Sequence, residues 1–141
     1  MTAGGPFAVR GVVEGFYGRP WSHEQRLDLI GFLADRGMNT FVYSPKDDPL
    51  MRHHWRAPYR DKARARLAEL IAACAGRGVD FVFCLSPGLT IRYSSRSDLA
   101  DLLAKYEDVA SLGVHRFGLL MDDIPAVLQH PEDLAAFDDL V

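Results

Sequence analysis

The stretch RFGLLMDDIP, residues 116–125, decides the fold. Its apolar run, 117–121, has the length and composition of a buried strand. The run ends in two adjacent aspartates, Asp122 and Asp123, and Pro125 follows two positions later. A charged pair at the end of a buried strand is costly unless something uses it. The rest of the chain shows whether this pattern is isolated or repeated.

Three more runs of the same kind precede this stretch. Each is short, rich in Val, Phe and Leu, and followed by Gly, Pro, Ser or Asp, which break strands and begin turns. The four runs predict strands over residues 7–13, 39–43, 79–85 and 114–121.

Between these runs the apolar residues recur at helical spacing. Ser22, with Gln25 three positions on, predicts a capping box at the start of the first helix. Gly37, Gly78 and Gly113 follow the first three periodic segments, as expected of C-terminal caps. The predicted helices span residues 22–36, 61–77, 97–112 and 131–141.

The predicted order is therefore β-α-β-α-β-α-β-α, an α/β fold with parallel strands and helical crossovers. Two architectures fit this order: an open doubly wound sheet and an eight-fold barrel. A barrel typically needs about 250 residues. The 141-residue chain supplies four β/α units, with neither a linker nor a second domain.

Composition limits the function classes. The chain is 48% hydrophobic and 25% charged, as expected of a globular domain, and its net charge of -3 argues against nucleic-acid or acidic-membrane partners. No apolar run approaches the roughly 18 residues of a membrane span. The start of the chain lacks a signal-peptide pattern, which predicts a cytoplasmic protein. Cys74 and Cys84 lie in apolar surroundings without metal or redox spacing, so buried free thiols are expected.

Polar or conformationally special residues follow all four predicted strands, whereas the opposite strand ends carry nothing comparable. In both architectures ligands bind at the carboxyl ends of the strands, so this asymmetry predicts a site there. The residues are Glu14, Gly15, Lys46, Asp47, Asp48, Ser86, Pro87, Gly88, Asp122 and Asp123.

Asp122 and Asp123 have a structural and a functional interpretation. An aspartate after a strand commonly caps a helix or bonds backbone amides. Two adjacent carboxylates resist double ionisation, so one pKa is expected to rise and to serve a general acid while the other stays an anion. That division suits glycoside hydrolysis. Both side chains reach one site only if the backbone bends, which is consistent with Pro125.

The other candidates are more ambiguous. Lys46 is either a solvated loop lysine or a donor to a substrate hydroxyl. Gly15 and Gly18 fit turns with positive φ or a close approach of the backbone to a ligand.

Three aromatic residues, Tyr17, Trp21 and Trp55, could line a sugar face, although such residues more often belong to a core. His53 and His54 could be metal ligands, although adjacent histidines in a charged loop usually are not. From spacing alone, Mg²⁺ could also be held by carboxylates at three strand ends. These are Glu14, Asp48 and Asp122.

Four motifs together resemble a known family. They are GVVEGFYGRPW (11–21), YSPKDDP (43–49), SPGL (86–89) and LLMDDI (119–124). In this order they resemble the catalytic domain of glycoside hydrolase family 84, the β-N-acetylglucosaminidases, which include protein O-GlcNAcases and enzymes labelled hyaluronidases. The resemblance extends over residues 9–124, nearly the whole chain.

The resemblance implies a TIM-type (β/α)8 barrel and a retaining mechanism in which the substrate's 2-acetamido group is the nucleophile, without a cofactor or a metal. By motif, Asp122 orients the acetamido N–H, and Asp123 is the general acid and then the base. Gly15 and Lys46 match positions that bind sugar hydroxyls. Further candidates for supporting contacts are Tyr17, Asp47 and Asp48.

One departure from the family pattern changes the expectation for this chain. The family also has sugar contacts on later strands, and the sequence stops at Val141 within the predicted fourth helix. Residues 1–141 are therefore expected to form the N-terminal half of a glycosidase domain. Half a barrel leaves two open sheet edges, so self-association or a complementing chain is expected.

The predicted function is hydrolysis of β-linked N-acetylglucosamine in a glycan or glycoprotein. The alternatives are a non-catalytic fragment that binds N-acetylglucosamine or a partner chain, and a metal-dependent barrel enzyme.

Overall fold

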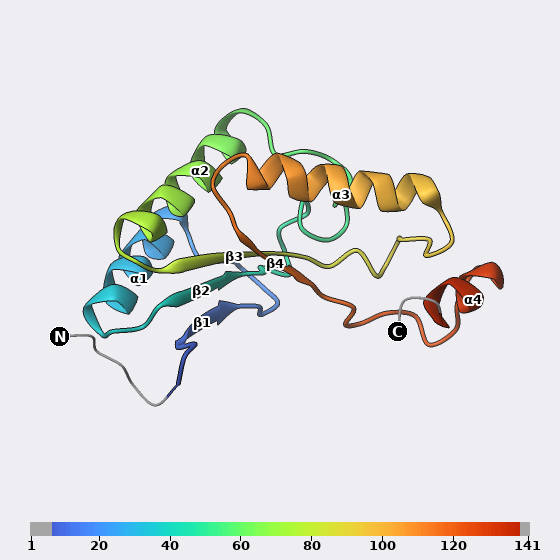
Figure 1. Cartoon of the computed structure of the whole chain (residues 1–141), viewed down its shortest axis with the longest axis horizontal. Helices are drawn as coiled ribbons and strands as arrows, with labels where there is room; N and C mark the ends of the chain where they lie inside the picture. Colours follow the sequence, from blue (N-terminus) through green and yellow to red (C-terminus); the bar gives the residue numbers. More distant parts are fainter. Residues whose placement is uncertain (1–6, 139–141) are drawn as a thin grey trace.

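The structure, a computed structural model, describes residues 7–138 and confirms the alternation of strands and helices (Figure 1). The elements, in chain order, are β1 (Gly11–Glu14), α1 (His23–Asp35), β2 (Thr40–Tyr43), α2 (Asp61–Gly76), β3 (Asp80–Leu85), α3 (Arg96–Ala110), β4 (Arg116–Leu119) and α4 (Glu132–Asp138).

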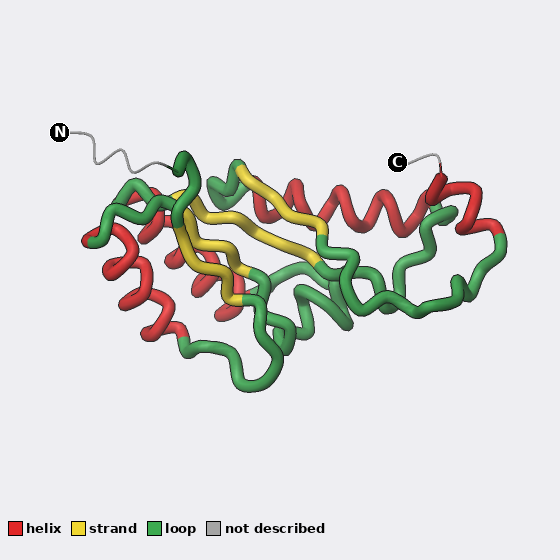
Figure 2. Tube along the Cα trace, turned by 90° about the horizontal axis from the view of Figure 1, so that it is seen from below, coloured by secondary structure: helices red, strands yellow, loops and turns green. Residues whose placement is uncertain are grey.

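The four strands form one parallel sheet in the order β1-β2-β3-β4. Helices α1, α2 and α3 contribute to a single core cluster with the sheet. In Figure 1, α2 and α3 lie above the strands, and in Figure 2, seen from below, no helix crosses in front of them. A doubly wound sheet reverses its strand order and carries helices on both faces. The described sheet is singly wound, so the doubly wound alternative is wrong.

The core lies between the helices and one face of the sheet. Alternate residues of β2 and β3 point into it, including Phe41, Phe81 and Phe83, which are at most 6% exposed. Burying side chains of this size stabilises a fold by roughly 1.5–3 kcal/mol each. On the opposite face Val13 of β1 is 60% exposed. One face of the sheet therefore packs, while the other stays open within residues 7–138.

The helix ends follow the sequence signals. Ser22 and Gln25 form the capping box: Gln25 N donates to Ser22 Oγ over 3.2 Å, and Ser22 N donates to Gln25 Oε1 over 2.8 Å. Gly37 and Gly78 adopt φ of 69° and 68° directly after the C-caps of α1 and α2. Only glycine adopts this conformation at no steric cost.

The strand bounds differ from the prediction at both edges of the sheet. β1 begins at Gly11 because its pairing with β2 starts there, where Gly11 lies opposite Thr40. β4 is shorter than 114–121 and ends at Leu119. The last predicted helix begins at Glu132, and its residues beyond 138 lie outside the described part.

Both cysteines are buried and free, as expected. Burial raises the pKa of Cys74 to about 12 and that of Cys84 to about 11, so both are protonated at neutral pH.

Candidate active site

The loops that follow the strands meet at the carboxyl edge of the sheet. They are residues 15–22 after β1, 44–60 after β2, 86–95 after β3 and 120–131 after β4. Because all four strands are parallel, side chains separated by up to 106 positions in the chain come into contact here.

Asp122 is held by two of these loops. Lys46, only 5% exposed, forms an ion pair with Asp122 Oδ2, and Ser86 Oγ donates to Asp122 Oδ1 over 3.3 Å. The hydrogen bond from Lys46 is the main reason why the pKa of Asp122 lies below its usual value. Asp122 is thus an anion near neutral pH, and the raised pKa expected within the pair does not belong to this residue.

Asp123 turns away from the strand because its backbone adopts φ of 55°, a left-handed conformation that aspartate tolerates better than most residues. This is the bend that the adjacent pair requires. The Tyr17 hydroxyl donates to Asp123 Oδ2, and Arg52 Nη2 lies 3.6 Å from the same oxygen. The two carboxylates are 46% and 51% exposed and have separate sets of partners.

The two glycines of the first loop differ. Gly18 has φ of 92°, as expected of a turn. Gly15 does not have a positive φ, so the predicted turn with positive φ is wrong at this position. A side chain there would lie 3.2 Å from Val13 Cγ1 and 3.3 Å from Ser44 Oγ, so glycine permits the close approach of two loops. Gly18 N donates to Asp47 Oδ2 over 2.9 Å, which ties the first loop to the second.

Asp48 shapes the second loop from inside. Its Oδ2 accepts from Tyr43 over 2.9 Å and from Tyr59 over 2.7 Å, and its Oδ1 accepts from Leu50 N over 2.9 Å. Burial, reinforced by Asp48, raises the pKa of both tyrosines. Asp48 therefore supports the site through the loop that also carries Lys46.

The carboxylates considered for Mg²⁺ do not form one ligand set. Glu14 is fully buried and pairs with Arg26 through two contacts of 2.8 Å, and it also accepts from Trp21 N over 3.0 Å. Asp48 and Asp122 have the partners given above. Among residues 7–138, no three His, Cys, Asp or Glu side chains are arranged to hold a metal ion. The site at Glu14, Asp48 and Asp122 is therefore a wrong alternative.

Of the three candidate wall residues, only Tyr17 contacts the aspartate pair. It is 56% exposed. Trp55 is fully buried in the core, with its Nε1 donating to Thr90 Oγ1 over 3.0 Å, and Trp21 packs edge-on against Phe16 at 5.2 Å. His53 and His54 are exposed.

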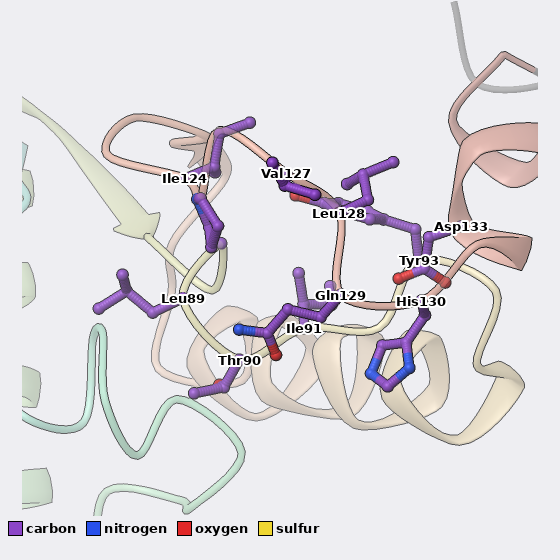
Figure 3. Close-up of a pocket in the computed structure, with 12 residues that line it drawn as sticks. Leu89, Thr90, Ile91, Tyr93, Ile124, Val127, Leu128, Gln129, His130 and Asp133 are labelled. Atoms are coloured by element: carbon purple, nitrogen blue, oxygen red, sulfur yellow. The ribbon is translucent and has the colours of Figure 1, made fainter.

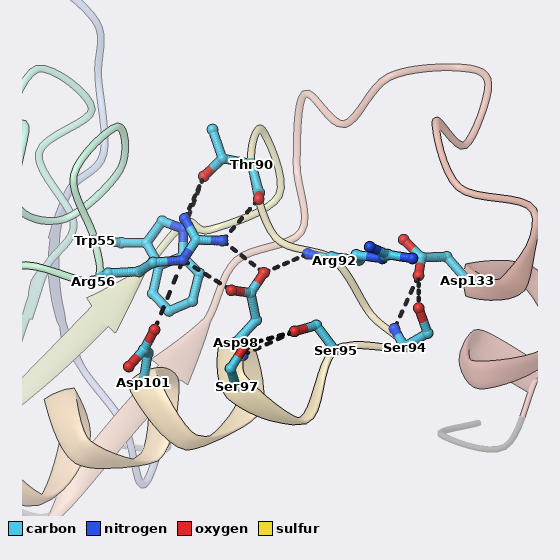
Figure 4. Close-up of polar contacts among 10 residues, drawn as sticks. All are labelled: Trp55, Arg56, Thr90, Arg92, Ser94, Ser95, Ser97, Asp98, Asp101 and Asp133. Atoms are coloured by element: carbon cyan, nitrogen blue, oxygen red, sulfur yellow. Dashed lines mark hydrogen bonds and ion pairs between the residues drawn. The ribbon is translucent and has the colours of Figure 1, made fainter.

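The third loop is braced by a network that the sequence did not reveal (Figure 4). Asp98, at the start of α3, accepts from Arg56 over 2.9 and 2.6 Å and from Arg92 N over 2.8 Å. Burial raises the pKa of Asp98, but these hydrogen bonds lower it by more, so that the carboxyl stays ionised. Further along, Ser94 N donates to Asp133 over 2.9 Å.

A pocket opens between the third and fourth loops (Figure 3), and Ile124, the residue after the aspartate pair, lines it. Glycine at position 88 lets the two loops approach closely, because a Cβ there would lie 2.5 Å from Ile124 Cγ2. The lining residues are Gly88, Leu89, Thr90, Ile91, Tyr93, Ile124, Pro125, Val127, Leu128, Gln129, His130 and Asp133.

Arg52 is the residue at the pair that sequence reasoning missed. Its side chain is buried, as are those of Met51 and Trp55 in the same loop. A single arginine in a loop gives no local sequence signal that its side chain is buried, because this burial results from tertiary packing alone.

The described helices, those within residues 7–138, include none that is long and apolar enough to cross a membrane.

Known proteins match this chain both in sequence and in structure. A family model described as beta-N-acetylglucosaminidase matches residues 10–138. The protein O-GlcNAcases of Rattus norvegicus and Mus musculus are each 42% identical over 114 residues, which is 81% of this chain but 12% of each relative.

Among solved structures, an Asp-to-Asn mutant of the Thermobaculum terrenum O-GlcNAc hydrolase superposes with a TM-score of 0.89 at 39% identity. The match covers 94% of this chain and 28% of that one. By sequence and by structure, the chain belongs to the β-N-acetylglucosaminidases, glycoside hydrolase family 84.

Proposed function

We propose that the protein hydrolyses β-linked N-acetylglucosamine with retention, using the substrate's 2-acetamido group as the nucleophile. The observation that supports this most directly is that two adjacent carboxylates have different partners and point in different directions. Asp122 is kept anionic by the buried Lys46, while Asp123 turns away and meets the Tyr17 hydroxyl.

The proposed roles follow from this difference. The Asp122 anion accepts a hydrogen bond from the acetamido N–H, which increases electron density on the acetamido oxygen as that oxygen attacks the anomeric carbon. The bond from this carbon to the glycosidic oxygen breaks, and Asp123 gives its proton to the leaving oxygen. The resulting oxazolinium ion, whose N–H stays hydrogen-bonded to Asp122, opens when Asp123, now a base, takes a proton from water that attacks the anomeric carbon. Gly15 and Lys46 bind sugar hydroxyls in this proposal.

The domain proposal is that residues 1–141 supply the first four β/α units of a TIM-type barrel. The singly wound sheet and the helices on one face support it. The chain spans 12% of the curated relatives and 28% of the matching structure. In this proposal the remaining sugar contacts come from further strands or from a second chain.

A glycoprotein substrate is supported by the names of the relatives, which are protein O-GlcNAcases. A non-protein glycan that ends in N-acetylglucosamine presents the same sugar. The cytoplasmic location stays a prediction from sequence.

One observation favours a second candidate, binding without turnover. The side chains of Asp122 and Asp123 are about half exposed, whereas electrostatic catalysis works best in a site that excludes water. Sugar binding in a titration, without release of product in an assay of the full-length protein, would support this candidate.

The test of the mechanism uses aryl glycosides whose N-acetyl group carries zero to three fluorines, assayed with the full-length protein. Fluorine withdraws electrons from the acetamido oxygen. A substrate nucleophile therefore predicts that kcat/KM falls with each added fluorine. A rate that does not depend on fluorination would indicate an enzymic nucleophile and would overturn the proposal.

A further inference from the structure

Arg52 is a buried cation that has no role in the proposed reaction steps. It lies in the loop after β2 and is only 7% exposed. A guanidinium at such a position is costly unless charged or polar groups compensate it. Its Nε is buried and has no hydrogen-bond partner within residues 7–138, so backbone contacts of that atom do not account for the burial.

The groups that compensate the Arg52 charge are the Asp123 carboxylate and the Tyr17 ring. Arg52 Nη2 lies 3.6 Å from Asp123 Oδ2, and the Arg52 guanidinium carbon lies 5.1 Å from the centre of the Tyr17 ring. The Tyr17 hydroxyl donates to that same Asp123 oxygen. Arg52, Tyr17 and Asp123 thus touch one another in a closed set of three, the Asp123 cluster.

The neighbouring carboxylate has a cation of its own. Asp122 pairs with Lys46, which is as deeply buried as Arg52 and lies six positions earlier in the same loop. The side chains that contact the pair are therefore Lys46 and Ser86 at Asp122, and Tyr17 and Arg52 at Asp123. One loop supplies a separate positive charge to each carboxylate.

We propose that Arg52 is a positioning residue that holds the Tyr17 ring and the Asp123 carboxylate in one fixed arrangement. This inference rests on the proposed function, in which Asp123 protonates the leaving oxygen. The planar guanidinium of arginine contacts a ring face and a carboxylate oxygen with a geometry that the compact ammonium of lysine does not reproduce.

The experiment compares Arg52→Met and Arg52→Lys in the full-length protein, with Arg56→Met as the matched control. Arg56 lies in the same loop, stacks on Trp55 at 4.2 Å, and binds Asp98 and Thr90 instead of the aspartate pair (Figure 4). Its loss should lower stability without changing how kcat/KM depends on the leaving group.

The expected readout is the dependence of kcat/KM on the leaving group, because protonation by Asp123 matters most when the leaving group is poor. Arg52→Met should lower kcat/KM on the order of tenfold for poor leaving groups and much less for activated aryl glycosides, because the acid is misplaced. Arg52→Lys should show the same pattern, because the geometry is lost.

Two results would overturn the inference. One is a loss of kcat/KM for poor leaving groups that is no larger in Arg52→Met than in Arg56→Met. The other, decisive if Arg52→Met does not fold, is an Arg52→Lys protein with the rate of the unmodified enzyme.

The NMR signals of the Tyr17 ring, assigned with Tyr17→Phe, separate this inference from the proposed function. A larger change of these signals in Arg52→Met than in Arg56→Met supports the role of Arg52 even if no glycoside is hydrolysed. Ring signals that are unchanged in Arg52→Met overturn it even if hydrolysis is normal.

Discussion

At the scale of single residues, the site is an arrangement of charge. Asp122 and Asp123 are neighbours in sequence, yet they differ in backbone conformation and in partners. The left-handed φ of Asp123 turns its side chain toward partners of its own. In the proposed mechanism the two side chains act on different atoms of one sugar, so mutation of each should have a different effect.

The acid role of Asp123 predicts a dependence on the leaving group. Asp123→Asn should lower kcat/KM by about 10²-fold or more for substrates with poor leaving groups, and much less for activated aryl glycosides, which need little protonation. The measurement is a series of aryl N-acetylglucosaminides whose phenols have increasing pKa. Equal losses across the series would show that Asp123 is not the general acid.

The anionic role of Asp122 predicts a loss of inhibitor binding. Asp122→Asn should weaken the binding of a cyclic oxazoline mimic by about 1–1.5 kcal/mol, because a hydrogen bond to a charged group is replaced by a neutral one. Lys46→Met should instead shift the pH dependence. Lys46 lowers the pKa of Asp122, so without it binding should be lost at a higher pH as the solution is acidified. Calorimetric titration at several pH values checks both variants.

At the scale of elements, the parts that the sequence predicted are those with local causes. The capping box at Ser22 and the glycines after α1 and α2 depend on residues within four positions of the helix end. The strand ends were found because polar residues interrupt apolar runs. Lys46 and Asp122, 76 positions apart, could be placed together because parallel strands end at one edge.

The parts that the sequence did not predict depend on packing between distant segments. Arg56 and Asp98 are 42 positions apart, and each looks like an ordinary surface residue of a loop or a first helical turn. Arg52 is similar. The length of β1 was overestimated because residues 7–10 are apolar enough for a strand, yet ladder pairing with β2 begins only at Gly11.

The Asp98 network predicts a measurable effect on stability. Asp98→Ala should lower the free energy of unfolding by about 2 kcal/mol, because Arg56 and the Arg92 amide lose a buried acceptor. Asp101→Ala is the control: its carboxylate is half exposed and lies 4.0 Å from Arg56, so a change below about 0.5 kcal/mol is expected. Urea unfolding measures both, and equal effects would contradict the role given to Asp98.

The same network has a pH signature. The folded-state pKa of Asp98 is lowered, so its contribution is fully present above the unfolded value of about 3.9 and is lost as pH falls through the folded value. The difference in stability between the parent and Asp98→Asn should therefore be constant near neutral pH and shrink below about pH 4. A difference that does not change down to pH 2 would show that the ionised form is not what stabilises the loop.

At the scale of the whole molecule, one face of the sheet is left uncovered by the described residues. Within residues 7–138, β1 and β4 have a strand on one side only, and Val13 is 60% exposed on the face opposite the helices. Free edges and exposed apolar surface favour association with another chain. This face also ends at the aspartate pair, so whatever covers it would complete the surroundings of the site.

Expressed alone, residues 1–141 are therefore expected to self-associate and to hydrolyse aryl N-acetylglucosaminides far more slowly than a complete family member. Identical chains commonly assemble with two-fold symmetry, and two such sheets could join their edges into one closed barrel.

Val13→Lys should reduce the association, because it places a charge on the open face. Phe32→Lys is the control, since Phe32 of α1 is 50% exposed but lies on a helix outside the open face. Light scattering and a turnover assay on the three purified chains measure both properties. A parent chain that is monomeric and fully active would contradict both the half-barrel architecture and the need for further sugar contacts. Equal loss of association in both variants would place the contact somewhere other than the open face.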